Sequence, residues 1–158
     1  MKVIVPGSYD PVTLGHLDVI ERAHAAYGEV YAVIFVNPKK SYTFSLEDRA
    51  RMLELATEHL SGVTVGFSDG YVVDYMREHG IQKIVKGYRN GDDLEYERVQ
   101  ADYNFTHGGF ETELIAASES LLHVSSTLAR KMIEGGKDLK SILPASSVRY
   151  LKQKGFIK

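Results

Sequence analysis

The chain has 158 residues, of which 44% are hydrophobic and 25% charged, a composition and length typical of one globular domain spanning residues 1–158. It contains no cysteine, which excludes disulfides and thiolate metal sites. The formal net charge is −2 and the pI is near 6.3, so any anionic ligand must be bound by a local cluster of cations. Because no apolar stretch has membrane-spanning length, we expect a cytoplasmic protein without membrane or nucleic-acid partners.

Strand-like and helix-like patterns alternate along the chain. The predicted strands are residues 2–5, 30–36, 63–67, 83–85 and 110–116. The predicted helices cover residues 15–27, residues 45 to 59 or 60, residues 71–79, residues 92 or 93 to 106, a segment from Ser125 or Ser126 to Gly135, and a short segment from Pro144. This alternation with short connections predicts an α/β fold with a doubly wound, parallel, five-stranded sheet. Ligands of such sheets bind beyond the carboxyl ends of the strands.

The first strand–helix connection, residues 6–16, is the first place to search for a site. It matches neither the G-x-G-x-x-G nor the G-x-x-x-x-G-K-[ST] pattern. Gly7 permits a close turn, and Ser8 supplies a hydroxyl and an amide. Gly15 and His16 fall in the first turn of a helix, where amides and the helix dipole attract an anion. His16 there can donate Nε2–H to a phosphate oxygen as negative charge develops, so the spacing favours phosphate chemistry.

Several segments carry a resemblance to a known family. Residues 8–16 (SYDPVTLGH) resemble the [T/S]-x-x-D-P-x-[T/H]-x-G-H element of the nucleotidyltransferase superfamily. Three further segments, each predicted to follow a strand, are residues 37–49, residues 86–97 and residues 124–127. Together they resemble the bacterial phosphopantetheine adenylyltransferases across essentially the whole chain, with that family's R-G-x-R, [FL]-E-Y-E and I-S-S-[ST] signatures in order. The resemblance implies a Rossmann-like nucleotidyltransferase fold.

This resemblance also implies an activity. It is the reversible transfer of AMP from ATP to 4′-phosphopantetheine, which gives dephospho-coenzyme A and pyrophosphate in coenzyme A biosynthesis. The implied cofactor is Mg²⁺, bound through ATP phosphates and water without protein ligands. The implied assembly is a homohexamer, with coenzyme A as a feedback inhibitor.

The resemblance assigns roles to particular residues. The implied catalytic residues are His16, Lys40 and Arg89. Phosphopantetheine would be bound by Ser8, Lys40, Val72 and Lys86. ATP would be bound by Ser8, Tyr9, His16, Gly87, Tyr88, Arg89, Glu97, Leu121, Leu122, His123, Val124, Ser125, Ser126 and Thr127.

Some positions depart from the usual family pattern. Ser8 replaces Thr and keeps the hydroxyl, whereas Lys86 replaces Arg and loses the bidentate fork. Residues 121–123 (LLH) replace a segment that often carries an aromatic near the adenine, and residues 116–117 lack a common proline. These departures bear on acceptor identity and nucleotide-pocket detail more than on reaction type.

Each segment also has a purely structural interpretation. Lys39 and Lys40 can be a solvated turn, and residues 125–127 can be only an N-cap. Arg89 and Glu97 can form a surface ion pair of little energetic value. Tyr96, Val99 and Tyr103 share one helical face, which we interpret as core packing.

Two other functions stay open. One is a different adenylyltransferase or cytidylyltransferase of the superfamily, for example one acting on nicotinamide mononucleotide, although such enzymes usually carry His where Thr13 stands. The other is a non-catalytic nucleotide sensor or flavodoxin-like interaction module. The coexistence of His16, Lys40 and Arg89 disfavours a mere binder, which has little need for all three.

Overall fold

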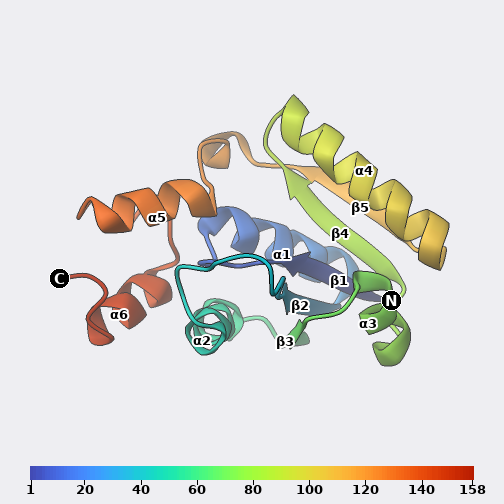
Figure 1. The fold of residues 1–158 in the computed structure, drawn as a ribbon, viewed down its shortest axis with the longest axis horizontal. Coiled ribbons are helices and arrows are strands. Elements are labelled where there is room, and N and C mark those ends of the chain that lie inside the picture. Colours follow the sequence, from blue (N-terminus) through green and yellow to red (C-terminus); the bar gives the residue numbers. More distant parts are fainter.

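The computed structural model describes all 158 residues and contains a five-stranded sheet with helices on both faces (Figure 1). The strands are β1 (Lys2–Gly7), β2 (Glu29–Phe35), β3 (Val63–Ser68), β4 (Lys83–Tyr88) and β5 (Glu111–Ala116). Their order in the sheet is β3-β2-β1-β4-β5, and every neighbouring pair is parallel. The predicted doubly wound, parallel, five-stranded α/β fold is confirmed.

Six α-helices and one short 3₁₀ helix connect and follow these strands. They are α1 (Leu14–Tyr27), α2 (Leu46–Thr57), α3 (Val72–His79), α4 (Gly91–Gly108), η1 (Glu119–Leu121), α5 (Ser126–Glu134) and α6 (Ala145–Gln153). Polar side chains accept a hydrogen bond from a free amide at the start of α2, α4 and α5, namely Ser45, Asn90 and Ser125. No helix combines the length and the apolar character that crossing a bilayer requires.

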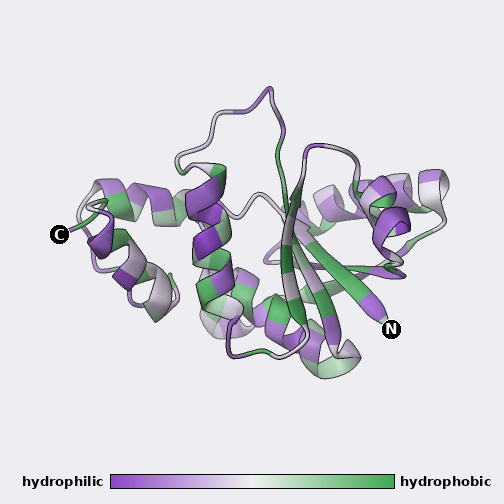
Figure 2. Cartoon of the chain, turned by 90° about the horizontal axis from the view of Figure 1, so that it is seen from below, coloured by the Kyte–Doolittle hydropathy of each residue, from purple (hydrophilic) through white to green (hydrophobic).

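Alternation along the strands sends side chains to two separate cores. Val3 and Val5 of β1 join the larger core, which also contains buried residues of α1, α2, α5 and α6. Ile4 points to the other face and packs with Met76 of α3 and Ile84 of β4. Figure 2 shows the hydrophobic residues concentrated in the central strands.

The strand order fixes where a ligand can bind. From β1 the chain builds β2 and β3 on one side, then returns to build β4 and β5 on the other. The order therefore reverses between β1 and β4, which is the switch point where open α/β sheets bind ligands. The β1–α1 loop and the end of β4 flank this point.

Some predicted boundaries are wrong near the switch point. β4 continues to Tyr88, so Lys86, Gly87 and Tyr88 lie within the strand and only Arg89 follows it. Their backbones pair with β5, as in the register Lys86↔Leu114, and this pairing outweighs the low strand propensity of lysine and glycine. Asn90, rather than Asp92 or Asp93, caps α4.

The prediction that Tyr96, Val99 and Tyr103 pack in the core is also wrong. These residues are 64%, 57% and 42% exposed. Glu97 is the only buried residue of α4, and Leu94, Ala101 and Asn104 on the same side of the helix are half-buried. The helix therefore turns a mixed polar and apolar face toward the protein, while its aromatic residues face solvent.

Candidate active site

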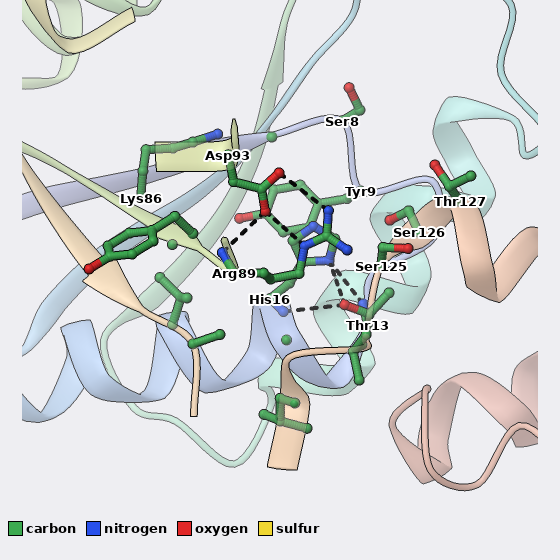
Figure 3. A pocket seen from close by; sticks show the side chains of 18 of the residues that line it. Ser8, Tyr9, Thr13, His16, Lys86, Arg89, Asp93, Ser125, Ser126 and Thr127 are labelled. Carbon is green, nitrogen blue, oxygen red and sulfur yellow. Dashed lines mark hydrogen bonds and ion pairs between the residues drawn. The ribbon is translucent and has the colours of Figure 1, made fainter. Parts of the chain in front are cut away.

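A cavity of about 410 Å³ lies at the switch point (Figure 3). The β1–α1 loop, the end of β4, the start of α4 and the start of α5 enclose it. Most residues that the sequence assigned to substrates line it: Ser8, Tyr9, His16, Lys86, Gly87, Tyr88, Arg89, Glu97, Leu121, Val124, Ser125, Ser126 and Thr127. The structure thus brings together residues that are up to 119 positions apart in the sequence (Ser8 and Thr127).

A second cavity of about 320 Å³ adjoins the first. It lies between the sheet and helices α3 and α4, and its lining includes Val72, Ile84 and Phe35. Ser8, Lys86 and Glu97 line both cavities and therefore mark their junction. Val72, assigned to phosphopantetheine from the sequence, lies in this second cavity.

The His16 ring is held by hydrogen bonds with Thr13, the first residue of the Thr13-Leu14-Gly15-His16 segment. The Thr13 side chain accepts a hydrogen bond from the His16 amide (3.3 Å), and Nδ1 of His16 accepts one from the Thr13 amide (3.0 Å). The two residues form a capping box in which histidine replaces the usual glutamate. Because Nδ1 acts as an acceptor, the neutral ring carries its proton on Nε2 and can donate it to a ligand.

The surroundings of His16 also favour its neutral form. Burial, followed by the nearby charges of Lys86 and Arg89, lowers the pKa of His16 from 6.5 to about 4. At neutral pH the imidazole is therefore a hydrogen-bond donor and not a cation. A phosphate oxygen that gains negative charge is the ligand that such a donor would stabilise.

Two helix N-termini meet at this cavity. Thr13, Gly15 and His16 belong to the start of α1, and Ser125 to Thr127 belong to the start of α5. The first amides of a helix lack intrahelical partners, and the helix dipole adds partial positive charge there. Together the two N-termini form a site suited to several phosphate groups.

The basic side chains at the cavity are only partly neutralised. Arg89 pairs with Asp93, with Nε 2.9 Å from Oδ2, and not with Glu97 as we considered from the sequence (Figure 3). Glu97 instead lies 3.5 Å from Lys86, and burial raises the pKa of this carboxyl although Lys86 opposes the shift. Lys86 Nζ also donates to the Pro6 carbonyl at 3.2 Å, which fixes the ammonium group at the junction of the two cavities.

Sequence reasoning missed Arg130, a third basic residue of this cavity. Its Nη1 donates to the Asp10 carbonyl at 2.8 Å, and its Nη2 donates to Thr127 Oγ1 at 3.2 Å. The position of Arg130 three residues after Thr127, hence on the same face of α5, was the signal that could have found it. Thr13 and Asp93 were missed as lining residues too.

Lys40, Leu122 and His123 do not line either cavity. Lys40 is exposed in the loop after β2, and its amide donates to the Asn37 carbonyl in a tight turn. The register Gly7↔Ile34 places this loop at the same edge of the sheet as Ser8. The catalytic role assigned to Lys40 therefore stays a prediction, which requires its side chain to reach toward the cavity.

Comparison with known proteins identifies the family. The cytidylyltransferase-like family model matches residues 4–132, which include the whole lining of both cavities. The chain belongs to this family. The chain is also similar to the phosphopantetheine adenylyltransferase of Symbiobacterium thermophilum, with 39% identity over 155 residues. The matched residues cover 98% of this chain and 96% of the relative. The resemblance noted in the sequence is thereby confirmed.

Proposed function

We propose that the protein transfers AMP reversibly from ATP to 4′-phosphopantetheine and releases pyrophosphate and dephospho-coenzyme A. The observation that carries this proposal is the junction of two cavities at Lys86. One cavity combines two helix N-termini with His16, Arg89 and Arg130, and the other is a partly apolar recess. The relative from Symbiobacterium thermophilum, which carries this enzyme's name, supports the choice of acceptor.

The proposed reaction is an in-line displacement at the α-phosphorus of ATP. An oxygen of the acceptor phosphate forms the new P–O bond while the bond to pyrophosphate breaks. The attacking oxygen is already ionised at neutral pH, so the protein needs to supply neither a nucleophile nor a strong base. Catalysis then consists of positioning the two phosphates and stabilising the charge that develops between them.

The residues of the phosphate cavity divide this work. In our proposal His16 donates Nε2–H to an α-phosphate oxygen, and Lys40 closes over the same phosphate. The start of α5 and Arg89 bind the β- and γ-phosphates, because amides, hydroxyls and a guanidinium group meet there. Ser8 and Lys86 hold the acceptor phosphate at the junction of the cavities.

The second cavity suits the arm of the acceptor. Val72, Ile84 and Phe35 offer apolar contacts, and Gln100 and Asn104 offer amide groups. Thr112 Oγ1 in the same lining is buried without a hydrogen-bond partner. A buried hydroxyl without a partner is costly, so a ligand bearing amides fits this recess better than a hydrocarbon chain does.

Mg²⁺ enters our proposal together with ATP. The chain brings together no group of three or more His, Asp or Glu side chains that could hold a metal ion. The donors around the phosphate cavity are mainly cations, amides and hydroxyls, which suit phosphate more than a bare divalent cation. Phosphate oxygens and water would therefore ligate Mg²⁺, which keeps several waters in most sites.

We further propose the homohexamer that the resemblance implies, with the enzyme acting in the cytoplasm under feedback inhibition by coenzyme A. The exposed face of α4 formed by Tyr96, Val99 and Tyr103 supports an assembly, because a second copy of the chain could cover these side chains. Light scattering coupled to size exclusion should give the mass of six chains. A single-chain mass would contradict the assembly without affecting the reaction.

A panel of substrates tests the reaction. Pyrophosphate release is measured with ATP or CTP as donor and with phosphopantetheine, unphosphorylated pantetheine or nicotinamide mononucleotide as acceptor. We expect pyrophosphate release only with ATP and phosphopantetheine. Pantetheine lacks the phosphate group whose ionised oxygen attacks the α-phosphorus. Release with nicotinamide mononucleotide alone, or with CTP alone, would replace our proposal by another activity of the superfamily. Binding of ATP without release with any acceptor would favour a nucleotide sensor.

A further inference from the structure

A buried arginine lies behind the phosphate cavity and lines neither cavity. Arg49 of α2 is only 2% exposed. Its Nε donates to the Phe44 carbonyl at 3.1 Å, and its Nη1 donates to the Ser8 carbonyl at 3.1 Å. No carboxylate lies within ion-pairing distance of it. Arg49 thus donates hydrogen bonds to two backbone carbonyls, one from each of the loops that follow β1 and β2.

The loop after β2 is attached to the same guanidinium group by an aromatic ring. The Tyr42 ring centroid lies 4.1 Å from Cζ of Arg49, a stacking distance for a cation over an aromatic face. Tyr42 Oη in turn accepts a hydrogen bond from the Asn37 amide at 2.8 Å. The two ends of the segment that carries Lys40, Asn37 and Phe44, are therefore both tied to Arg49.

The contact with Ser8 has a consequence for the cavity side of the chain. The Ser8–Tyr9 peptide is trans, so its N–H and its C=O point in opposite directions. With the Ser8 carbonyl turned to Arg49, the Tyr9 amide is directed away from Arg49, and both residues line the phosphate cavity (Figure 3). The Tyr9 amide donates to no backbone carbonyl of the chain. An unsatisfied amide at this place is a donor for a phosphate oxygen.

Tyr9 itself is held in an uncommon conformation. Its φ of 49° lies in the left-handed region, which a bulky residue adopts only when its surroundings enforce it. Its ring is buried, and its hydroxyl donates to the Val5 carbonyl at 2.7 Å. Asp10, next in the chain, accepts hydrogen bonds from the Thr43 and Phe44 amides, each at 2.9 Å. The two loops are therefore joined to each other as well as to Arg49.

We propose that Arg49 is a positioning residue that fixes the Ser8–Tyr9 peptide and the Lys40 loop in one relative arrangement around the transferred phosphate. Arg49 touches no substrate and acts only through these two loops. Burying a charge is costly unless it is hydrogen-bonded, and the acceptors that Arg49 uses belong to the two loops that flank the cavity. The inference rests on the proposed function, because the reaction described there supplies its kinetic readout.

The kinetic test compares Arg49→Met and Arg49→Lys with Arg51→Met, a control at an exposed arginine of the same helix. For Arg49→Met we expect kcat to fall about 30–100-fold, since a misplacement near 1 Å can cost 10²-fold, while KM for ATP changes less than about threefold. Arg49→Lys should have a thermal unfolding midpoint closer to that of wild type than Arg49→Met has. Its kcat should still be at least about tenfold below wild type, because an ammonium cannot reproduce the guanidinium fork. Arg51→Met matches the wild type. A folded Arg49→Met enzyme with kcat within twofold of wild type would overturn the proposal.

A second measurement does not depend on activity. Limited trypsin digestion reports cleavage after Lys39 and Lys40, which lie in the loop that Arg49 is proposed to hold. We expect cleavage there to be at least about fivefold faster in Arg49→Lys than in wild type or Arg51→Met, without faster cleavage elsewhere. Equal cleavage at this loop, or faster cleavage throughout the chain, would contradict a local positioning role. This result stands even if the substrate panel disproves the proposed reaction.

If Arg49→Met does not fold, variants of Tyr42 can replace it in the kinetic test. Tyr42→Leu keeps Arg49 but removes the ring stacked on it and the acceptor of the Asn37 amide. We expect kcat to fall about tenfold in Tyr42→Leu and less than threefold in Tyr42→Phe, which keeps the ring. Wild-type kcat in both Tyr42→Leu and Arg49→Lys would overturn the proposal.

Discussion

The two loops that follow β1 and β2 reach the same edge of the sheet but differ in how their functional side chains are held. His16, in the first turn of the helix that follows the first loop, is bonded to Thr13 in both directions and lines the cavity. Lys40, in the second loop, is exposed and lines no cavity, although the loop around it is tied down at Asn37 and Phe44. The His16 imidazole is therefore in place before substrate binds. The backbone around Lys40 is held, but its side chain extends into solvent.

This difference has an energetic meaning. A donor that is already oriented needs no reorganisation when charge develops, so it stabilises the transition state more than the bound substrate. A long lysine side chain loses rotamer freedom when it closes over a phosphate, and this loss reduces its net contribution. We therefore expect His16 to matter more for kcat than Lys40 does.

The largest expected effect is that of His16→Ala. We expect kcat to fall by about 10³-fold, the upper end for loss of one oriented donor, while the Kd for ATP changes only a few-fold. Steady-state kinetics and calorimetric titration with ATP measure the two quantities. His24→Ala, at another histidine of α1 whose Nε2 contacts the Ser61 carbonyl, serves as the control. Turnover unchanged by His16→Ala would remove this side chain from the mechanism.

Lys40→Gln should have a smaller effect than His16→Ala. A hydrogen bond to a charged group contributes about 1.5–3 kcal/mol, so we expect kcat to fall about 10–100-fold. Lys39→Gln is the matched control in the same turn, and kinetics at saturating ATP compare the two variants. Equal losses in both would mean that the loop supplies only a diffuse positive charge. A loss larger than that of His16→Ala would reverse the ranking of the two loops.

The fixed position of α1 depends on a residue without a side chain. A Cβ on Gly87 would lie 2.6 Å from Cγ2 of Val19, closer than such atoms can approach. Gly87→Ala should therefore lower the free energy of unfolding by about 1–3 kcal/mol, the usual cost of overpacking. Denaturant titration measures the change, and Gly91→Ala, where a Cβ meets no atom within 4 Å, is the control. If Val19→Ala does not restore stability in the Gly87→Ala background, the steric explanation is wrong.

The last expected effect concerns pH and is absent at neutral pH. His16 has a folded-state pKa of about 4 against 6.5 for an ordinary histidine, so between these values the unfolded chain binds a proton that the folded chain does not. His16 therefore reduces the free energy of unfolding progressively as pH falls from 6.5 toward 4, and has no such effect above that range. Denaturant titrations at several pH values should show this loss in wild type and a weaker one in His16→Gln. The same acid dependence in both would contradict the neutral imidazole.

The sequence predicted the sheet well because its strands are short apolar runs between turns, as in residues 30–36. It located the phosphate cavity for a related reason, since Ser8, His16 and Ser125 each follow a strand or begin a helix. Periodicity could not show which partner covers a helical face, and for that reason Tyr96, Val99 and Tyr103 were placed in the core. The buried contacts of Arg49 with Ser8 and Phe44 depend on how two loops fold against each other, which no local pattern encodes.

The fate of the phosphorus atoms of ATP tests most directly whether the protein transfers AMP. With α-³²P-labelled ATP and phosphopantetheine, we expect the label to appear in the acceptor product, and label from γ-³²P-labelled ATP to appear only in pyrophosphate. His16→Ala should slow both transfers equally. If label from the γ position appeared in the acceptor product instead, the protein would be a phosphoryl-transfer enzyme, and the placement of His16 at the α-phosphate would be contradicted.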